Sequence, residues 1–170
     1  MLFRSIDHLK DAFLFSESKR YDVKGKHYFD YPNKYYCEDV GLRNARLNFR
    51  QYEPSHIMEN IVYNELRRRS YNVDVGVVEV RQKSDEGKDV RNQLEIDFVA
   101  NKGSERVYIQ SALNMDSDKK TESELNSLLL TKDFFKKIVI RMDISHNFYD
   151  ANGIYHCNLI DFLLNNQDLF

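Results

Sequence analysis

Cysteine and long apolar runs are both scarce in this chain of 170 residues. The two cysteines, Cys37 and Cys157, stand far apart and lack metal-ligand spacing, so reduced intracellular thiols are expected rather than a disulfide. No apolar stretch reaches the roughly 18–20 residues that a membrane span needs. The N-terminal residues lack the apolar core and small-residue cleavage site of a signal peptide. These absences predict a cytoplasmic protein with no membrane partner.

Several catalytic and binding signatures are also absent. The five histidines show no paired metal-ligand spacing, and no G-x-S-x-G elbow accompanies the serines of the chain. Net charge is only −2, from 25 basic and 27 acidic residues, which argues against a dedicated, strongly basic nucleic-acid binder but leaves room for a local basic patch. With 42% hydrophobic and 13% aromatic residues, the chain can bury a core.

The pattern along the chain predicts an α/β domain with a small N-terminal appendage. Pro54, one of two prolines, precedes the first strongly helical stretch, so we place a boundary near residue 53, between an appendage over 1–53 and a main domain over 54–170. The appendage combines a helix over 5–15, a hairpin turning at Lys24 and Gly25, and a short strand and helix within 32–50. From residue 55 onward, the pattern predicts the order α-β-β-β-α-β, followed by a further strand and helix within 153–164. The predicted elements are a helix over 55–69, strands over 73–81, 93–100 and 106–112, a helix over 121–130 and a strand over 136–143.

The helix over 55–69 carries acidic residues close to its apolar face. Ser55 is expected to cap its N-terminus. At about 100° per residue, an apolar arc faces the core, and Glu65 falls inside this arc while Glu59 falls at its edge. A carboxylate directed at a sheet is costly unless it is paired or bound to a ligand. The sequence leaves two interpretations open. Either Glu65 pairs with an arginine at the edge of the core and Glu59 is a solvated rim residue, or a carboxylate on this face binds a ligand. The apolar arc consists of Ile57, Met58, Ile61, Val62 and Leu66.

Strand alternation predicts where the remaining acids point. Over 93–100, Glu95 and Asp97 share one face, opposite a face that includes Ile96 and Phe98, which indicates either a solvent face or a site. In the strand over 106–112, Gln110 shares its face with Tyr108 and Ala112. If these strands are neighbours, Asp97 and Gln110 could project to one place and hold a hard cation such as Mg²⁺, which takes oxygen ligands and activates water.

Lysines alternate with tyrosines over residues 19–36, and this stretch has two interpretations. A wing-like hairpin of this composition could lie along a phosphate backbone, with lysines for charge and aromatic rings for stacking. Alternatively, the tyrosines pack the appendage against the main domain. Asp22 and Asp30 within this stretch, and Glu38 just after it, dilute the positive charge and therefore favour packing.

The stretches RYDVKGKHYF, ENIVYNEL, EIDFVA and YIQ together resemble the C-terminal domain of unknown function that follows an AAA-type ATPase module in many bacteria and archaea. The resemblance covers roughly residues 10–164. It implies an upstream module that binds ATP. The phosphate-binding motif G-x-x-x-x-G-K-[ST] occurs nowhere in this chain, so the chain is expected to be a fragment without ATPase activity. Its first residues resemble the remnant of a winged-helix linker.

The domain of that family is similar to the PD-(D/E)XK restriction-endonuclease-like fold, with its αβββαβ core. The resemblance makes Glu59 and Asp97 the metal ligands and Gln110 the third catalytic residue, whereas Ala112 stands where the pattern has a lysine. The lysine normally stabilises charge at phosphorus, so it would have to come from elsewhere, such as Lys102, Lys119 or Lys120. We therefore expect a non-catalytic domain that binds nucleic acid, a protein partner or a second copy of itself, or regulates its ATPase; the rival is a Mg²⁺-dependent phosphodiesterase.

Overall fold

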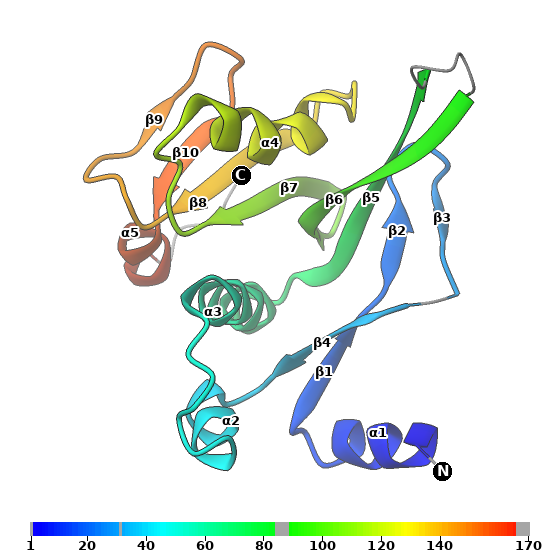
Figure 1. Ribbon diagram of the computed structural model, residues 1–170, viewed down its shortest axis with the longest axis vertical. Helices are drawn as coiled ribbons and strands as arrows, with labels where there is room; N and C mark the ends of the chain where they lie inside the picture. Colours follow the sequence, from blue (N-terminus) through cyan, green and yellow to red (C-terminus); the bar gives the residue numbers. More distant parts are fainter. Residues whose placement is uncertain (1, 31, 84–88, 166–170) are drawn as a thin grey trace.

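In a computed structural model that describes residues 2–30, 32–83 and 89–165, one mixed sheet carries helices on both of its faces (Figure 1). Eight of the described strands form this sheet in the order β3-β2-β5-β6-β7-β8-β10-β9, and β1 and β4 form a separate antiparallel ribbon. No helix in these residues is long and apolar enough to cross a membrane. The helices are α1 (Leu2–Asp11), α2 (Val40–Arg46), α3 (Pro54–Arg68), α4 (Asp118–Leu129) and α5 (Leu159–Leu164); the strands are β1 (Phe15–Ser18), β2 (Arg20–Asp22), β3 (His27–Tyr28), β4 (Lys34–Cys37), β5 (Asn72–Lys83), β6 (Asp89–Lys102), β7 (Glu105–Ala112), β8 (Lys136–Arg141), β9 (Phe148–Tyr149) and β10 (Tyr155–Asn158).

The predicted α-β-β-β-α-β order from α3 to β8 is confirmed, and the chain is of the mixed α/β class. The short strands β1 and β9 were not predicted. The helix expected over 5–15 ends at Asp11, and Phe15 already belongs to β1. The N-cap prediction for Ser55 was wrong: α3 begins at Pro54, whose missing N–H is no loss in the first turn, and Glu53 takes the cap position. The polar run over 83–89 predicts a solvated hairpin loop, but its residues 84–88 lie outside the described residues, and Lys83 and Asp89 belong to β5 and β6.

The sheet runs through the boundary predicted near residue 53. The hairpin of β2 and β3 forms as predicted, with Tyr21 opposite Tyr28, but β2 then pairs in parallel with β5. The first 53 residues therefore contribute two strands to the main sheet. The remaining part of this segment, with α1, α2 and the β1–β4 ribbon, lies at the lower end of the view in Figure 1.

Two apolar clusters pack the sheet from its two faces. The first lies under α3 and α5 and includes Leu66, Phe98 and Phe162, whereas the second lies under α4 and includes Ile96, Tyr108 and Leu128. The amphipathic pattern of α3 explains the first cluster, since Met58, Val62 and Leu66 are buried against the strands as the apolar arc predicts.

A β-bulge in β6 changes which residues face α3. Asp74 lies opposite Val99 and Gly76 lies opposite Ile96, so β6 advances by three residues where β5 advances by two. Phe98 consequently packs in the cluster under α3, while Ile96 and Val99 pack in the cluster under α4. The prediction of strict alternation, with Ile96 and Phe98 on one face, was wrong. The extra residue shifts the alternation by one position, so the side chains that follow it point to the opposite face of the sheet from the one predicted.

Candidate functional site

Asp97 lies at the β-bulge, on the face of the sheet that α3 covers. Its Oδ2 accepts hydrogen bonds from the backbone N–H of Ser111, at 2.8 Å, and from the Ser111 hydroxyl, at 3.1 Å. Only 8% of Asp97 is exposed. Burial, followed by the negative charge of Glu59, raises the pKa of Asp97 to about 7, so this carboxyl group changes its charge near neutral pH.

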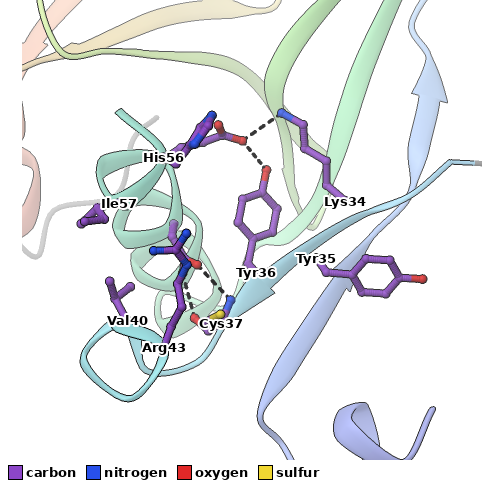
Figure 2. Close-up of a pocket in the computed structure, with 10 residues that line it drawn as sticks. Lys34, Tyr35, Tyr36, Cys37, Val40, Arg43, His56 and Ile57 are labelled. Atoms are coloured by element: carbon purple, nitrogen blue, oxygen red, sulfur yellow. Dashed lines mark hydrogen bonds and ion pairs between the residues drawn. The ribbon is translucent and has the colours of Figure 1, made fainter. Parts of the chain in front are cut away.

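Glu59 reaches the same region from α3. Its Oε1 accepts hydrogen bonds from the Tyr36 hydroxyl at 2.7 Å and from the Lys34 ammonium at 2.9 Å, both of which come from β4. Figure 2 shows Lys34 and Tyr36 directed at this carboxylate. The interpretation of Glu59 as a solvated rim residue was therefore wrong, since its side chain is only 16% exposed.

Lys34 links the acids of this cluster. Its ammonium also pairs with Glu95 Oε1, and the second oxygen of Glu95 accepts a hydrogen bond from Arg20 at 2.6 Å. Burial lowers the pKa of Lys34, but the carboxylates of Glu59, Glu95 and Asp97 outweigh burial and raise it. The ammonium therefore stays charged, and we call Lys34, Glu59, Glu95 and Asp97 the Lys34 cluster.

Tertiary packing from α3 fixes the position of β4, and thereby of Lys34. Asn60 exchanges two hydrogen bonds with the backbone of Cys37, from its N–H at 2.9 Å and to its carbonyl at 2.7 Å. The Tyr36 ring stacks on Tyr63, with centroids 4.0 Å apart. The packing interpretation of the 19–36 stretch is confirmed for Tyr36, which belongs to the buried core.

Gln110, predicted as the third site residue, is directed elsewhere. Its Oε1 accepts a hydrogen bond from the backbone N–H of Asp97 at 3.3 Å, but its amide donates to Glu124 of α4 at 3.0 Å. Its neighbours Tyr108 and Ala112 pack in the cluster under α4. The Gln110 side chain thus lies on the opposite face from the Asp97 carboxyl group, because the β-bulge directs Asp97 toward α3. Ser111, which sequence analysis did not select, contacts Asp97 instead.

The lysines proposed as substitutes are also placed elsewhere. The Lys102 ammonium lies 5.3 Å from the centre of the Tyr71 ring. Lys119 and Lys120 both belong to α4, and Lys120 bonds to Asn114. Lys34, far earlier in the chain, is the lysine beside Glu59 and Asp97. Lys34 and Tyr36 stand two residues apart on the short strand β4, a spacing that predicts a shared face. The packing of the β1–β4 ribbon on α3 depends on tertiary contacts and is not encoded in this local pattern.

The other acid of α3, Glu65, behaves as its simpler interpretation predicts. It forms ion pairs with Arg68 at 2.7 Å and with Arg69 at 2.6 Å. Burial raises the pKa of Glu65, but these two arginines outweigh burial and lower it. Glu65 therefore stabilises the C-terminal turn of α3 and does not belong to the Lys34 cluster.

A cavity of about 310 Å³ opens between β4, α2 and α3 and reaches the Lys34 cluster. Figure 2 shows its wall, with Arg43 and His56 around the cavity. Both basic groups contact Glu53, Arg43 at 3.5 Å and His56 at 3.1 Å. The cavity gives small molecules access to Glu59 and Lys34, the two members of the cluster that line it.

The residues present do not fit a Mg²⁺ site as they stand. A hard divalent ion needs several free oxygen ligands, whereas Glu59 Oε1 is occupied by Lys34 and Tyr36, and Asp97 Oδ2 by Ser111. The Lys34 ammonium would repel a second cation at this place. Over the described parts of the chain, no three His, Cys, Asp or Glu side chains form a group that could hold a metal ion.

Comparison with curated proteins gives a match over most of this chain. An uncharacterised protein of Haemophilus influenzae is 35% identical over 162 residues. The matched region is 94% of this chain but 36% of the relative, so the chain spans about a third of the length of the curated relative it matches. No family model and no solved structure matches the chain.

Proposed function

We propose that this chain is a non-catalytic, nuclease-like domain that serves a longer protein by binding a partner. The observation that carries the proposal is the Lys34 ammonium, bound to Glu59 and Glu95 beside Asp97. Lys34 supplies from within the chain the positive charge that a metal ion would bring to these carboxylates. A restriction-endonuclease-like ancestry would account for the αβββαβ order and for the two acids, Glu59 and Asp97, on one face.

The charge balance supports a structural role for the Lys34 cluster. Metal-assisted phosphodiester hydrolysis needs a cation held by free carboxylates and a group that stabilises the charge at phosphorus. In this cluster the lysine is engaged by acids, and the third position of the family pattern, Gln110, bonds to Glu124 across the sheet. The cluster therefore ties β4 to α3 and β6 instead of activating water.

The longer protein is proposed to carry an AAA-type ATPase module, with ATP bound there and not in this chain. The sequence resemblance supports the ATPase module. The relative, about two thirds of which lies outside the matched region, supports only the occurrence of such a domain in a longer protein. In such a protein this domain would bind nucleic acid or a protein partner, or regulate the ATPase.

A Mg²⁺-dependent DNA or RNA phosphodiesterase is the second candidate. One observation favours it: Glu59 and Asp97 do lie on one face of the sheet, next to a lysine and a cavity. Hydrolysis would require Lys34 to leave at least one of its carboxylate partners when metal and substrate bind.

A cleavage assay separates the two. The protein is incubated with labelled single-stranded DNA, double-stranded DNA and RNA, in Mg²⁺ and in Mn²⁺, alongside Asp97→Ala and the matched surface variant Asp118→Ala. We expect all substrates to stay intact with all three proteins. Cleavage by the unaltered protein and by Asp118→Ala that is lost in Asp97→Ala would replace the proposal with the phosphodiesterase.

A further inference from the structure

A second cavity, of about 340 Å³, lies on the other side of the sheet from the Lys34 cluster. It opens where the β2–β3 turn, the β6–β7 turn and the segment between α4 and β8 meet. Tyr21, which lines it, packs in the apolar cluster under α4, which places the cavity on that face. The lining groups that matter here are Tyr21, Lys26, Ser104, Glu105, Arg106 and Phe135.

Arg106 is held in this cavity by aromatic rings. Its guanidinium carbon lies 4.9 Å from the centre of the Tyr21 ring and 5.5 Å from that of Phe135. Its Nε donates to Asn101 Oδ1 at 2.8 Å, which fixes the plane of the group. No described carboxylate lies within ion-pair distance of Arg106, although Asp74 acts on it at longer range. The guanidinium is therefore pre-oriented but not neutralised, as suits recognition of an anion.

Lys26 adds a second positive charge. It occupies the tip of the β2–β3 turn in a left-handed backbone conformation, with φ +55°, and its N–H donates to the Asp22 carbonyl at 2.8 Å. Its ammonium has no carboxylate partner within the described ranges. Glu105 is the single acid among the residues that line the cavity, so Lys26 and Arg106 leave a local excess of positive charge in a chain of net charge −2.

Phe135 provides a flat apolar surface beside these cations. Phe135 is 43% exposed, its contact with Tyr108 is edge-on, with centroids 6.0 Å apart and planes at 86°, and Arg106 lies over its ring. The preceding residue, Phe134, is fully exposed. An exposed aromatic ring next to fixed positive charge is the combination with which proteins bind a base and its phosphate.

We propose that this cavity binds a nucleotide, either free or as a unit of a single strand, with its phosphate on Arg106 and Lys26 and its base against Phe135. Guanidinium groups recognise phosphate through paired N–H donors, and an ammonium group adds a point charge. Because the cavity and the Lys34 cluster lie on opposite faces of the sheet, the proposal holds whether or not the Lys34 cluster is catalytic.

Binding is tested on the intact chain with three probes: a fluorescein-labelled 12-residue oligothymidylate, ATP and inorganic phosphate. Fluorescence anisotropy follows the oligonucleotide, and the two unlabelled probes are measured by calorimetry, all at low salt. We expect a nucleotide probe to bind at least about tenfold more tightly than inorganic phosphate, because stacking adds to the charge interaction. A strand is the ligand if the oligonucleotide binds more tightly than ATP and its affinity falls steeply with salt; a free nucleotide is the ligand if ATP binds as tightly or more tightly.

Three variants locate the site. Lys26→Ala should weaken nucleotide binding several-fold, Arg106→Gln about tenfold or more, and Phe135→Leu about fivefold or more. Lys119→Ala removes the same charge from an exposed position on α4 and should leave binding unchanged. Since Arg106 and Phe135 also contribute to packing, thermal melting checks that these two variants fold; Lys26 is exposed, so its variant tests the site without that difficulty.

The proposal is overturned if neither nucleotide probe binds, or if Lys26→Ala and Lys119→Ala bind like the unaltered protein. It is also overturned if inorganic phosphate binds as tightly as both nucleotide probes, since the base then makes no contribution.

Discussion

Replacing Asp97 with asparagine should stabilise the protein at neutral and alkaline pH. Asparagine keeps the shape of the side chain and an oxygen that can accept from the Ser111 N–H, which now donates to Asp97 at 2.8 Å. It removes a negative charge that is buried next to Glu59. The neutral amide therefore removes the repulsion between this position and the Glu59 carboxylate.

The size of the effect follows from the pKa of Asp97, which burial raises from 3.8 to about 7. A difference of about three units corresponds to about 4 kcal/mol at 1.36 kcal/mol per unit. The folded protein holds this proton to a higher pH than the unfolded chain does, so the free energy of unfolding decreases as pH rises from about 4 to about 7. Asp97→Asn should be more stable by up to about 4 kcal/mol at pH 8 and by little at pH 4.

Urea unfolding of both proteins at pH values from 4 to 8 measures this difference, provided that the slopes with denaturant agree. The matched surface variant Asp118→Asn should show no comparable gain at pH 8. The reasoning is refuted if Asp97→Asn is no more stable than the unaltered protein at pH 8, or if its advantage is as large at pH 4 as at pH 8.

Two further predictions concern how β4 and β6 are positioned. Asn60→Ala should lower the free energy of unfolding by about 2 kcal/mol in urea unfolding, because the buried N–H of Cys37 loses its acceptor; Asn64→Ala should cost less, since the Cys37 carbonyl keeps its bond from Asn60. Gly76→Ala should cost about 1–3 kcal/mol in the same assay, because the added Cβ would lie 2.9 Å from Ile96 Cβ beside the β-bulge. An Asn60→Ala variant no less stable than Asn64→Ala, or a Gly76→Ala variant of unchanged stability, would contradict these assignments.

Much of the fold could be predicted from local patterns in the sequence. The apolar arc of α3 and the β-branched stretches of β5 to β8 encode their own periodicity, so the order of elements in the main domain is readable without tertiary information. The N-cap of α3 was misplaced by two residues, at Ser55 instead of Glu53, because Pro54 also suits the first helical turn.

The candidate site was only partly predictable, for two physical reasons. The β-bulge in β6 depends on close packing against Gly76 of the partner strand, and strand alternation does not predict it. The bulge places the Asp97 and Gln110 side chains on opposite faces of the sheet. Lys34 reaches Glu59 only because the β1–β4 ribbon docks on α3, a contact between residues 25 positions apart. The choice of Glu59 and Asp97 came from the family resemblance, because residue type and periodicity alone also left Glu65 and Glu95 as candidates.

Measurement of the Asp97 pKa by ¹³C NMR, in the unaltered protein and in Lys34→Met, tests the Lys34 cluster most directly. If Lys34, Glu59 and Asp97 share one buried site, the pKa of Asp97 lies well above 3.8 in the unaltered protein and rises further in Lys34→Met, because the ammonium of Lys34 lowers it. An Asp97 pKa in the ordinary range, or one that the loss of Lys34 leaves unchanged, would contradict the shared site.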